Sequence, residues 1–186
     1  MGWWSPKDGP LDWTKAFSTG EYSHPYYSLG RVWRVQILLA PSLNLSTYVE
    51  GSFTKKYPFS IVPDKPLNIT RAFGLFRDHY EGTTFDPTAP PAGGPCSNPY
   101  RNWDTFDEHD RLYQGVLKPG AWPRTLSTNP RGYSYVAQAR DRLPDAIGGI
   151  SWLGFSAPAE TCYAPFYAGI TGIPEAYQKG VPLNWI

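Results

Sequence analysis

The sequence contains little cysteine and little histidine. Among 186 residues there are two cysteines, Cys96 and Cys162, and three histidines. Two cysteines cannot build a disulfide framework or a four-cysteine zinc site, although they leave room for one bridge. We therefore expect no structural metal and no cofactor, and the cysteine count leaves the redox compartment open.

One segment resembles part of a zinc-deaminase signature but lacks a ligand. That signature has a histidine and a glutamate two residues apart, then a Pro-Cys pair and a second cysteine three residues later. His79 and Glu81 fit the first half, and Pro95 and Cys96 begin the second. Pro99 stands at the position of the second cysteine, so the ligand set is incomplete and a deaminase is not supported.

Long apolar runs and an excess of one charge are also missing. No apolar stretch approaches the roughly 18 residues that a membrane-spanning helix needs, and residues 1–10 do not have the pattern of a signal peptide. Charged residues make up 18% of the chain, and the net charge is +1. This balance argues against nucleic acid or an anionic membrane as a partner bound by bulk electrostatics.

Glycine, proline and aromatic residues are abundant instead. The chain has 18 glycines, 20 prolines, 8 tryptophans, 13 tyrosines and 9 phenylalanines. Disordered chains are poor in aromatic residues. We therefore expect a folded, loop-rich α+β protein with large aromatic side chains in its core.

Hydrophobic periodicity and proline positions predict several helices. A short helix is expected near residues 11–17, a longer one over 26–39, and another short one over 134–142. The clearest helix covers residues 68–80, with Asn68 as its N-cap. Its apolar residues fall on one face and are expected to be buried: Ile69, Phe73, Phe76 and Tyr80.

Short apolar segments predict strands near the C-terminus. Residues 148–154 and 161–166 are expected to form antiparallel neighbours, with Trp152 and Tyr163 on the sheet faces. Residues 124–128 predict a further strand. Between the helix predicted over 68–80 and these strands, residues 82–103 form a long loop rich in proline and glycine, and such loops usually carry function.

The densest polar run covers residues 77–83, where the clearest helix meets the long loop. Arg77, His79 and Glu81 are the candidate substrate-binding residues in this run. The alternative is a helix end of structural importance only, because a cation near the C-terminus of a helix is favourable in itself.

A cysteine–histidine hydrolase is another hypothesis. Cys96 or Cys162 would need His24, His79 or His109 within hydrogen-bond reach as a base. The spacing neither supports nor excludes such a pair. Cys162 lies in an apolar segment, which favours a packing role.

Six short segments, in order along the chain, make this sequence resemble the bacterial dipeptidase A family, which is related to the secernins. The longest are YPFSIVPD at 57–64 and RDHYEGT at 77–83. The others are RVWR at 31–34, APSL at 40–43, GGISW at 148–152 and YAPFY at 163–167. The resemblance extends over nearly the whole chain, and the segments follow the family's order.

The resemblance implies an N-terminal-nucleophile hydrolase that cleaves dipeptides, with two stacked antiparallel sheets between helix layers. In such enzymes a cysteine exposed by processing attacks the amide, and its own α-amine is the base. Family members are much longer and carry this cysteine before the region that matches. We therefore expect residues 1–186 to be a single, incomplete dipeptidase-like domain that is inactive alone, because the acyl intermediate needs the nucleophile.

The resemblance also implies one catalytic candidate. In related cysteine amidases an arginine late in the chain begins a strand and faces the nucleophile, and Arg124 is the best match to that position. Its charge would stabilise a thiolate or an oxyanion. A structural arginine is the alternative.

The competing hypothesis for the whole chain is a non-catalytic module that binds carbohydrate or peptide through exposed aromatic side chains. The aromatic content and the lack of an obvious catalytic set motivate it. On the sequence alone, both hypotheses stand.

Overall fold

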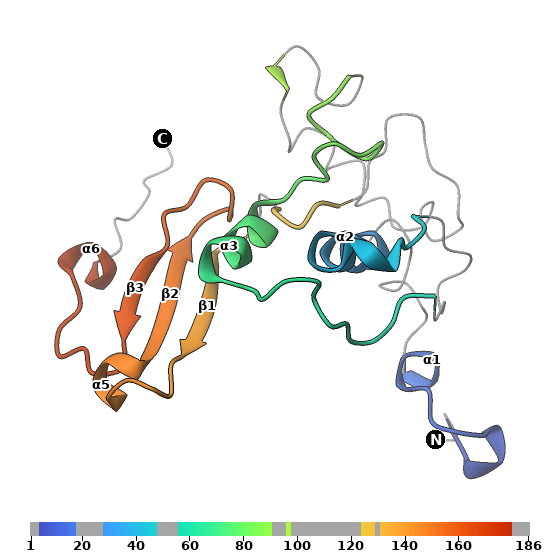
Figure 1. Ribbon diagram of the computed structural model, residues 1–186, viewed down its shortest axis with the longest axis horizontal. Coiled ribbons are helices and arrows are strands. Elements are labelled where there is room, and N and C mark those ends of the chain that lie inside the picture. Colours follow the sequence, from blue (N-terminus) through green and yellow to red (C-terminus); the bar gives the residue numbers. More distant parts are fainter. Residues whose placement is uncertain are drawn as a thin grey trace. The chain divides into compact units, whose positions relative to one another are not determined.

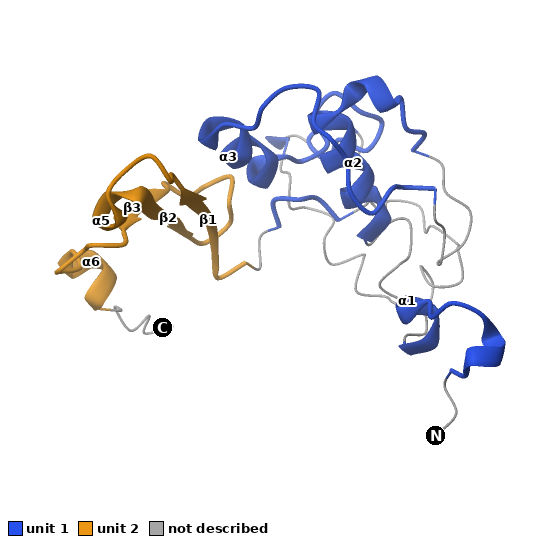
Figure 2. Cartoon of the chain, turned by 60° about the horizontal axis from the view of Figure 1, so that its bottom comes forward, with its two compact units in different colours: residues 1–129 blue, residues 130–186 orange. Residues whose placement is uncertain are grey.

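The computed structural model describes residues 4–17, 28–47, 56–90, 96–97, 124–128 and 131–179. The chain divides into two compact units, Met1–Asn129 (unit 1) and Pro130–Ile186 (unit 2), coloured separately in Figure 2. The described part of unit 1 carries helices, and unit 2 carries a three-stranded antiparallel sheet with two short helices (Figure 1). This mixture confirms the predicted α+β class. His24 and His109 lie outside the described residues.

Unit 1 contains the short 3-10 helices η1 (Pro6–Asp8) and η4 (Pro41–Leu43) and the helices α1 (Trp13–Phe17), α2 (Gly30–Leu39) and α3 (Ile69–Arg77). Helix α1 confirms the short helix predicted near 11–17, and α2 confirms the one predicted over 26–39. The amide of Ala40 closes α2 with a 2.8 Å bond to the carbonyl of Gln36. Pro41 then begins η4, so proline ends the helix as predicted.

The predicted N-cap of α3 is confirmed, but its predicted end is not. The side chain of Asn68 accepts a 2.8 Å hydrogen bond from the amide of Arg71. The helix stops at Arg77 because the next residue, Asp78, is extended. Tyr80 is therefore outside the helix, although it is fully buried.

The expected burial of the α3 stripe is wrong at Phe76. Ile69 and Phe73 are half-buried, whereas Phe76 is 38% exposed. Because α3 ends three residues earlier than predicted, Tyr80 is buried by its own tertiary contacts and not as part of a continuous helical stripe. The burial of Tyr80 therefore says nothing about Phe76, one turn before it.

The loop between α2 and α3 holds the end of α2. Arg71 donates a 2.6 Å hydrogen bond to the carbonyl of Leu38, and the amide of Asp64 donates one of 3.0 Å to the carbonyl of Leu39. The carboxylate of Asp64 accepts bonds from the amide and hydroxyl of Ser42, and these bonds lower its pKa. Carbonyls that a helix end leaves without partners are thus satisfied from α3 and the loop.

Unit 2 contains strands β1 (Tyr133–Ala139), β2 (Gly149–Phe155) and β3 (Ala164–Tyr167), and helices α5 (Asp145–Gly148) and α6 (Glu175–Gln178). The strands lie in the order β1-β2-β3, and both pairs are antiparallel. Strands β2 and β3 confirm the predicted antiparallel neighbours and place Trp152 in β2. The predicted start of the second strand is wrong, since β3 begins at Ala164 and Tyr163 precedes it.

The helix predicted over residues 134–142 is wrong, since this segment forms β1. Its burial alternates: Ser134 is buried and Val136 and Gln138 are half-buried, while Tyr133 and Tyr135 are exposed. That period of two fits a strand with one covered face. Strand β1 pairs with β2 over its whole length, along one edge. Among the described residues, no helix is both long and apolar enough to cross a membrane.

Candidate functional site

A buried ion pair in unit 1 forms the centre of the candidate site. Arg34, on α2, and Asp78, directly after α3, are 7% exposed each. The Nε of Arg34 lies 2.9 Å from both carboxylate oxygens of Asp78, and its Nη2 lies 2.6 Å from Oδ2. Removing one partner of such a pair leaves an uncompensated buried charge, so the two residues depend on each other.

Asp78 also fixes the backbone that follows α3. Its Oδ1 accepts a 2.9 Å hydrogen bond from the amide of Tyr80. Tyr80 has a φ of 64°, in the left-handed region that a bulky residue rarely adopts. The side-chain bond and the complete burial of the Tyr80 ring offset the strain of that conformation.

The ring of Tyr80 belongs to an aromatic cluster. Its centroid lies 6.5 Å from that of Trp33 and 6.1 Å from that of Phe85, within the range of favourable aromatic pairs. Burial raises the pKa of the Tyr80 hydroxyl well above its usual range. The phenol therefore stays protonated at neutral pH and acts as a hydrogen-bond donor.

Glu81 provides the polar group of the site that reaches solvent, with 53% of its side chain exposed. Its Oε2 accepts a 2.7 Å bond from the amide of His79, and its Oε1 lies 3.2 Å from Nδ1 of that residue. Partial burial raises the pKa of Glu81, but the bonds from His79 outweigh it and lower the pKa to about 2. Glu81 is therefore an anion at neutral pH. The carbonyl of Glu81 accepts a further bond from Arg34.

The segment 124–128 contacts this site through its backbone. The hydroxyl of Tyr80 donates a 3.1 Å bond to the carbonyl of Arg124, and the amide of Ser127 donates a 3.0 Å bond to the carbonyl of Asp78. The strand predicted over 124–128 is wrong. The hydroxyl of Thr125 bonds to the carbonyl of Ser127 at 2.5 Å, and such a local bond replaces strand pairing with a bend.

The structure brings together only part of the predicted site. His79, Glu81 and Arg124 belong to one network with Arg34, Asp78 and Tyr80, whereas Arg77 has an exposed side chain on the last turn of α3. Both cysteines are exposed with unbridged thiols, so the packing role expected for Cys162 is wrong. Cys162 lies in the loop before β3, where no strand pairing covers it.

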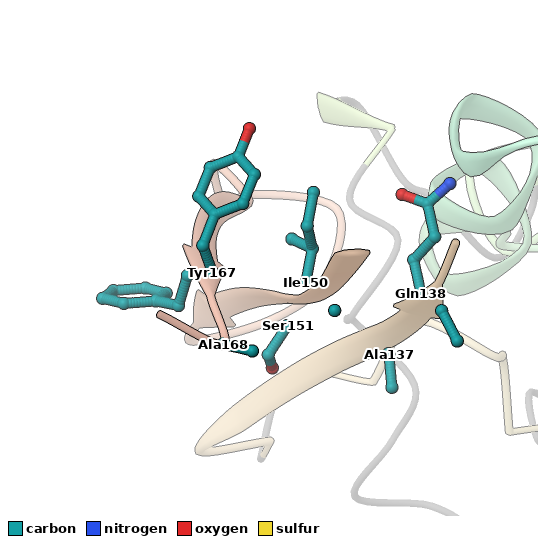
Figure 3. Close-up of a pocket in the computed structure, with 9 residues that line it drawn as sticks. Ala137, Gln138, Ile150, Ser151, Tyr167 and Ala168 are labelled. Atoms are coloured by element: carbon teal, nitrogen blue, oxygen red, sulfur yellow. The ribbon is translucent and has the colours of Figure 1, made fainter. Parts of the chain in front are cut away.

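A separate hollow lies on the sheet of unit 2. It has a volume of about 520 Å³ and is lined by all three strands. Figure 3 shows Gln138, Ile150 and Tyr167 projecting from one face and Ala137 and Ser151 from the other. Of the nine residues that line it, Tyr167 is the one with a titratable side chain. The hollow therefore offers little chemistry, and the polar network of unit 1 is the stronger candidate.

Comparison with known proteins adds the family. The sequence model described as Peptidase family C69 matches residues 4–183. The chain belongs to peptidase family C69. The match includes both units and all residues of the polar network.

The relatives of this C69 chain carry dipeptidase names. A "Probable dipeptidase" of Salmonella dublin is 26% identical over 180 residues, covering 97% of this chain and 35% of the relative. A "Probable dipeptidase" of Latilactobacillus sakei is 22% identical over 175 residues, 94% of this chain and 31% of the relative. "Dipeptidase A" of Lactobacillus helveticus is 30% identical over 71 residues, 38% of this chain and 15% of the relative.

The C69 chain thus spans about a third of the length of the first two relatives, 35% and 31%. No solved structure matches it.

Sequence reasoning missed three members of the network in this C69 chain: Arg34, Asp78 and Ser127. Arg34 and Asp78 lie inside two of the segments that carry the family resemblance, but neither stood out by its local pattern. The position of Arg34 between the apolar residues Trp33 and Val35 is the signal that points to a buried guanidinium and hence to a distant carboxylate. Ser127 uses its backbone amide, so no side-chain pattern reveals it.

Proposed function

We propose that this chain is part of a cysteine-type dipeptidase that hydrolyses the peptide bond of dipeptides. Its membership of a peptidase family over residues 4–183 is the observation that carries the proposal. The dipeptidase names of its relatives support the substrate class.

We further propose that residues 1–186 form an incomplete dipeptidase-like domain, whose nucleophile is a cysteine outside them. Cys96 and Cys162 are exposed, and neither has a hydrogen bond or ion pair in the part of the chain that the structure describes. An internal cysteine needs a separate base, since it has no α-amine of its own. The 186-residue chain alone is therefore expected to be inactive.

Arg124 is the proposed catalytic residue of this segment. Its side chain is half-buried, and its backbone is bound by the polar network. A guanidinium is always charged and stabilises an oxyanion or thiolate through several N–H donors. Its role would be to stabilise the charge that develops during attack.

Glu81 is the proposed contact for the substrate's α-amine. It is ionised at neutral pH and half-exposed, which suits a carboxylate that receives a cation from solvent. His79 is 6% exposed and holds this carboxylate through its amide and ring, so its role is orientation. Arg77, the third candidate of the polar run, would receive the substrate carboxylate from its exposed position.

The test compares dipeptide hydrolysis by a full-length polypeptide carrying these residues with hydrolysis by the 186-residue chain. We expect turnover by the first and none by the second. In the full-length enzyme, Arg124→Ala should lower kcat by roughly 100- to 1,000-fold, the usual effect of losing an oxyanion donor. Arg142→Ala, at an exposed arginine, is the matched control and should leave kcat unchanged.

Cys96→Ala and Cys162→Ala decide where the nucleophile lies. We expect neither to change turnover by the full-length enzyme. Turnover by the 186-residue chain that either substitution abolishes would make that cysteine the nucleophile. Binding of carbohydrate without any turnover would favour the aromatic binding module instead.

A further inference from the structure

Two segments of unit 1 that lie far apart in the sequence are joined by two hydrogen bonds. The Tyr80 hydroxyl donates to the carbonyl of Arg124, 44 residues later, and the Ser127 amide donates to the carbonyl of Asp78. Each segment donates one of the two bonds and accepts the other. Together they fix both the distance and the register of 124–128 against the turn after α3.

The Tyr80 side of this junction is rigid. Tyr80 is 0% exposed, and its ring packs against those of Trp33 and Phe85, which also contact each other. Its backbone is held in the left-handed region by Asp78, which is itself held by Arg34. The position of the Tyr80 hydroxyl is therefore fixed by three things: aromatic packing, the bond from the Tyr80 amide to Asp78, and the buried ion pair between Asp78 and Arg34.

The Arg124 side is anchored but irregular. Residues 124–128 form neither helix nor strand, yet Thr125 is 5% and Ser127 is 0% exposed. A bond to the carbonyl of Arg124 fixes the peptide plane directly after its Cα. That plane contains the Cα of Arg124 and so sets the point from which its half-buried side chain leaves the backbone.

We propose that Tyr80 is a positioning residue for Arg124, with Asp78 and Arg34 holding Tyr80 in place. This proposal rests on the proposed catalytic role of Arg124. Tyr80 touches the backbone of Arg124 and acts through it. A misplaced guanidinium loses much of its effect on the transition state, because catalytic groups must be held close to their productive geometry.

The first test is kinetic and uses a double-mutant cycle in the full-length enzyme. Tyr80→Phe removes the hydroxyl and keeps the aromatic ring. We expect it to lower kcat by roughly ten- to a hundredfold with little change in KM, the effect of misplacing a catalytic group. In an Arg124→Ala background, Tyr80→Phe should have no further effect, since the group that it positions is absent.

The matched control is Tyr57→Phe. Tyr57 also donates its hydroxyl to a backbone carbonyl of unit 1, that of Ser46, at 2.8 Å. A general loss of stability from a missing phenol would appear in both variants. We expect Tyr57→Phe to leave kcat unchanged in both backgrounds.

The second test is hydrogen exchange and needs no activity. In the 186-residue chain, Tyr80→Phe should speed exchange of the Ser127 amide at least tenfold more than Tyr57→Phe does. Equal exchange rates in the two variants would overturn the proposal.

The two proposals fail in different ways. If Arg124→Ala leaves kcat unchanged, the catalytic role of Arg124 is wrong, and its positioning by Tyr80 falls with it. If Arg124→Ala lowers kcat while Tyr80→Phe has no effect, or the same effect in both backgrounds, only the positioning role is wrong.

Discussion

Unit 1 and unit 2 achieve order by different means. In the described part of unit 1, most of the buried residues of the site are polar or charged, among them Arg34, Asp78, His79 and Ser127. In unit 2, three strands pair in sequence, and the buried positions are small residues with Ile150 as the one large aliphatic side chain among those described. Unit 1 therefore depends on particular side chains, whereas unit 2 depends on backbone pairing.

The difference teaches where a single substitution acts. A side-chain network fails when one member is removed, since its partners are left buried without compensation. A strand ladder tolerates many side-chain changes, because its hydrogen bonds come from the backbone, but it does not tolerate a clash. Substitutions of each kind should therefore separate the two units.

The largest effect is expected from Asp78→Ala. It leaves the buried Arg34 guanidinium without its bidentate partner, and such a loss costs about 3–5 kcal/mol of unfolding free energy. Urea unfolding, with hydrogen exchange over α2, measures the loss. The double variant Arg34→Met with Asp78→Leu removes both charges and should be more stable than Asp78→Ala. If the double variant is no more stable than Asp78→Ala, the loss of stability does not come from the unpaired charge of Arg34.

The next largest effect is expected in unit 2, where a side chain at Gly169 would clash with Ala146. A Cβ at Gly169 would lie 2.7 Å from the Cβ and 2.9 Å from the carbonyl oxygen of Ala146. We expect Gly169→Ala to cost roughly 1–3 kcal/mol, the usual cost of overpacking, and to speed hydrogen exchange in α5 and β3. Gly172→Ala, where a Cβ has no neighbour within 4 Å, is the control. If the two variants are equally stable, Gly169 does not pack closely against Ala146 of α5.

A smaller effect is expected at the start of α3. Asn68→Ala removes the side-chain bond to the amide of Arg71 and should cost about 1 kcal/mol. Thr70→Ala, at an exposed position in the same turn, should cost less. Thermal unfolding of both variants measures the difference, and a larger loss for Thr70→Ala would argue against the cap.

The smallest effect is the pH dependence that Glu81 contributes. Its pKa is lowered from 4.5 to about 2 in the folded protein, so it stabilises the fold above pH 4.5 and loses this contribution as the pH falls toward 2. Glu81→Gln should therefore be less stable than the natural chain at pH 7, with a difference that shrinks between pH 4.5 and 2. Glu175→Gln, in an exposed pair with Lys179, is the control. If the difference in stability between Glu81→Gln and the natural chain stays constant down to pH 2, the ionisation of Glu81 is not its cause.

Local patterns were enough to predict the elements that depend on local contacts. Asn68 identified the start of α3, Pro41 the end of α2, and the apolar segment with Trp152 the central strand. Residues 134–142, most of which form strand β1, were predicted as a helix from local periodicity and the proline that follows them. The true state of this segment depends on pairing with β2, which a local window does not contain.

The site was only partly predictable for the same reason. The polar run 77–83 drew attention to His79 and Glu81, and the family resemblance to Arg124. The partners that organise them are remote: Arg34 meets Asp78 across 44 residues, and Ser127 contributes a backbone amide. The strand predicted at 124–128 is wrong because other partners take the backbone groups of Ser127. Its carbonyl accepts a bond from the hydroxyl of Thr125, and its amide donates to the distant carbonyl of Asp78.

The distance between Arg34 and Asp78 along the chain has a consequence for the nascent protein. A ribosome that adds roughly 5–20 residues per second needs about 2–9 s to pass from one partner to the other, a separation of 44 residues. Arg124, the partner of Tyr80, follows 44 residues after that tyrosine. Helix α2 therefore leaves the ribosome with a hydrated arginine on the face that it will later bury. Until Asp78 emerges, that face cannot close, and during these seconds α2 is accessible to chaperones and proteases.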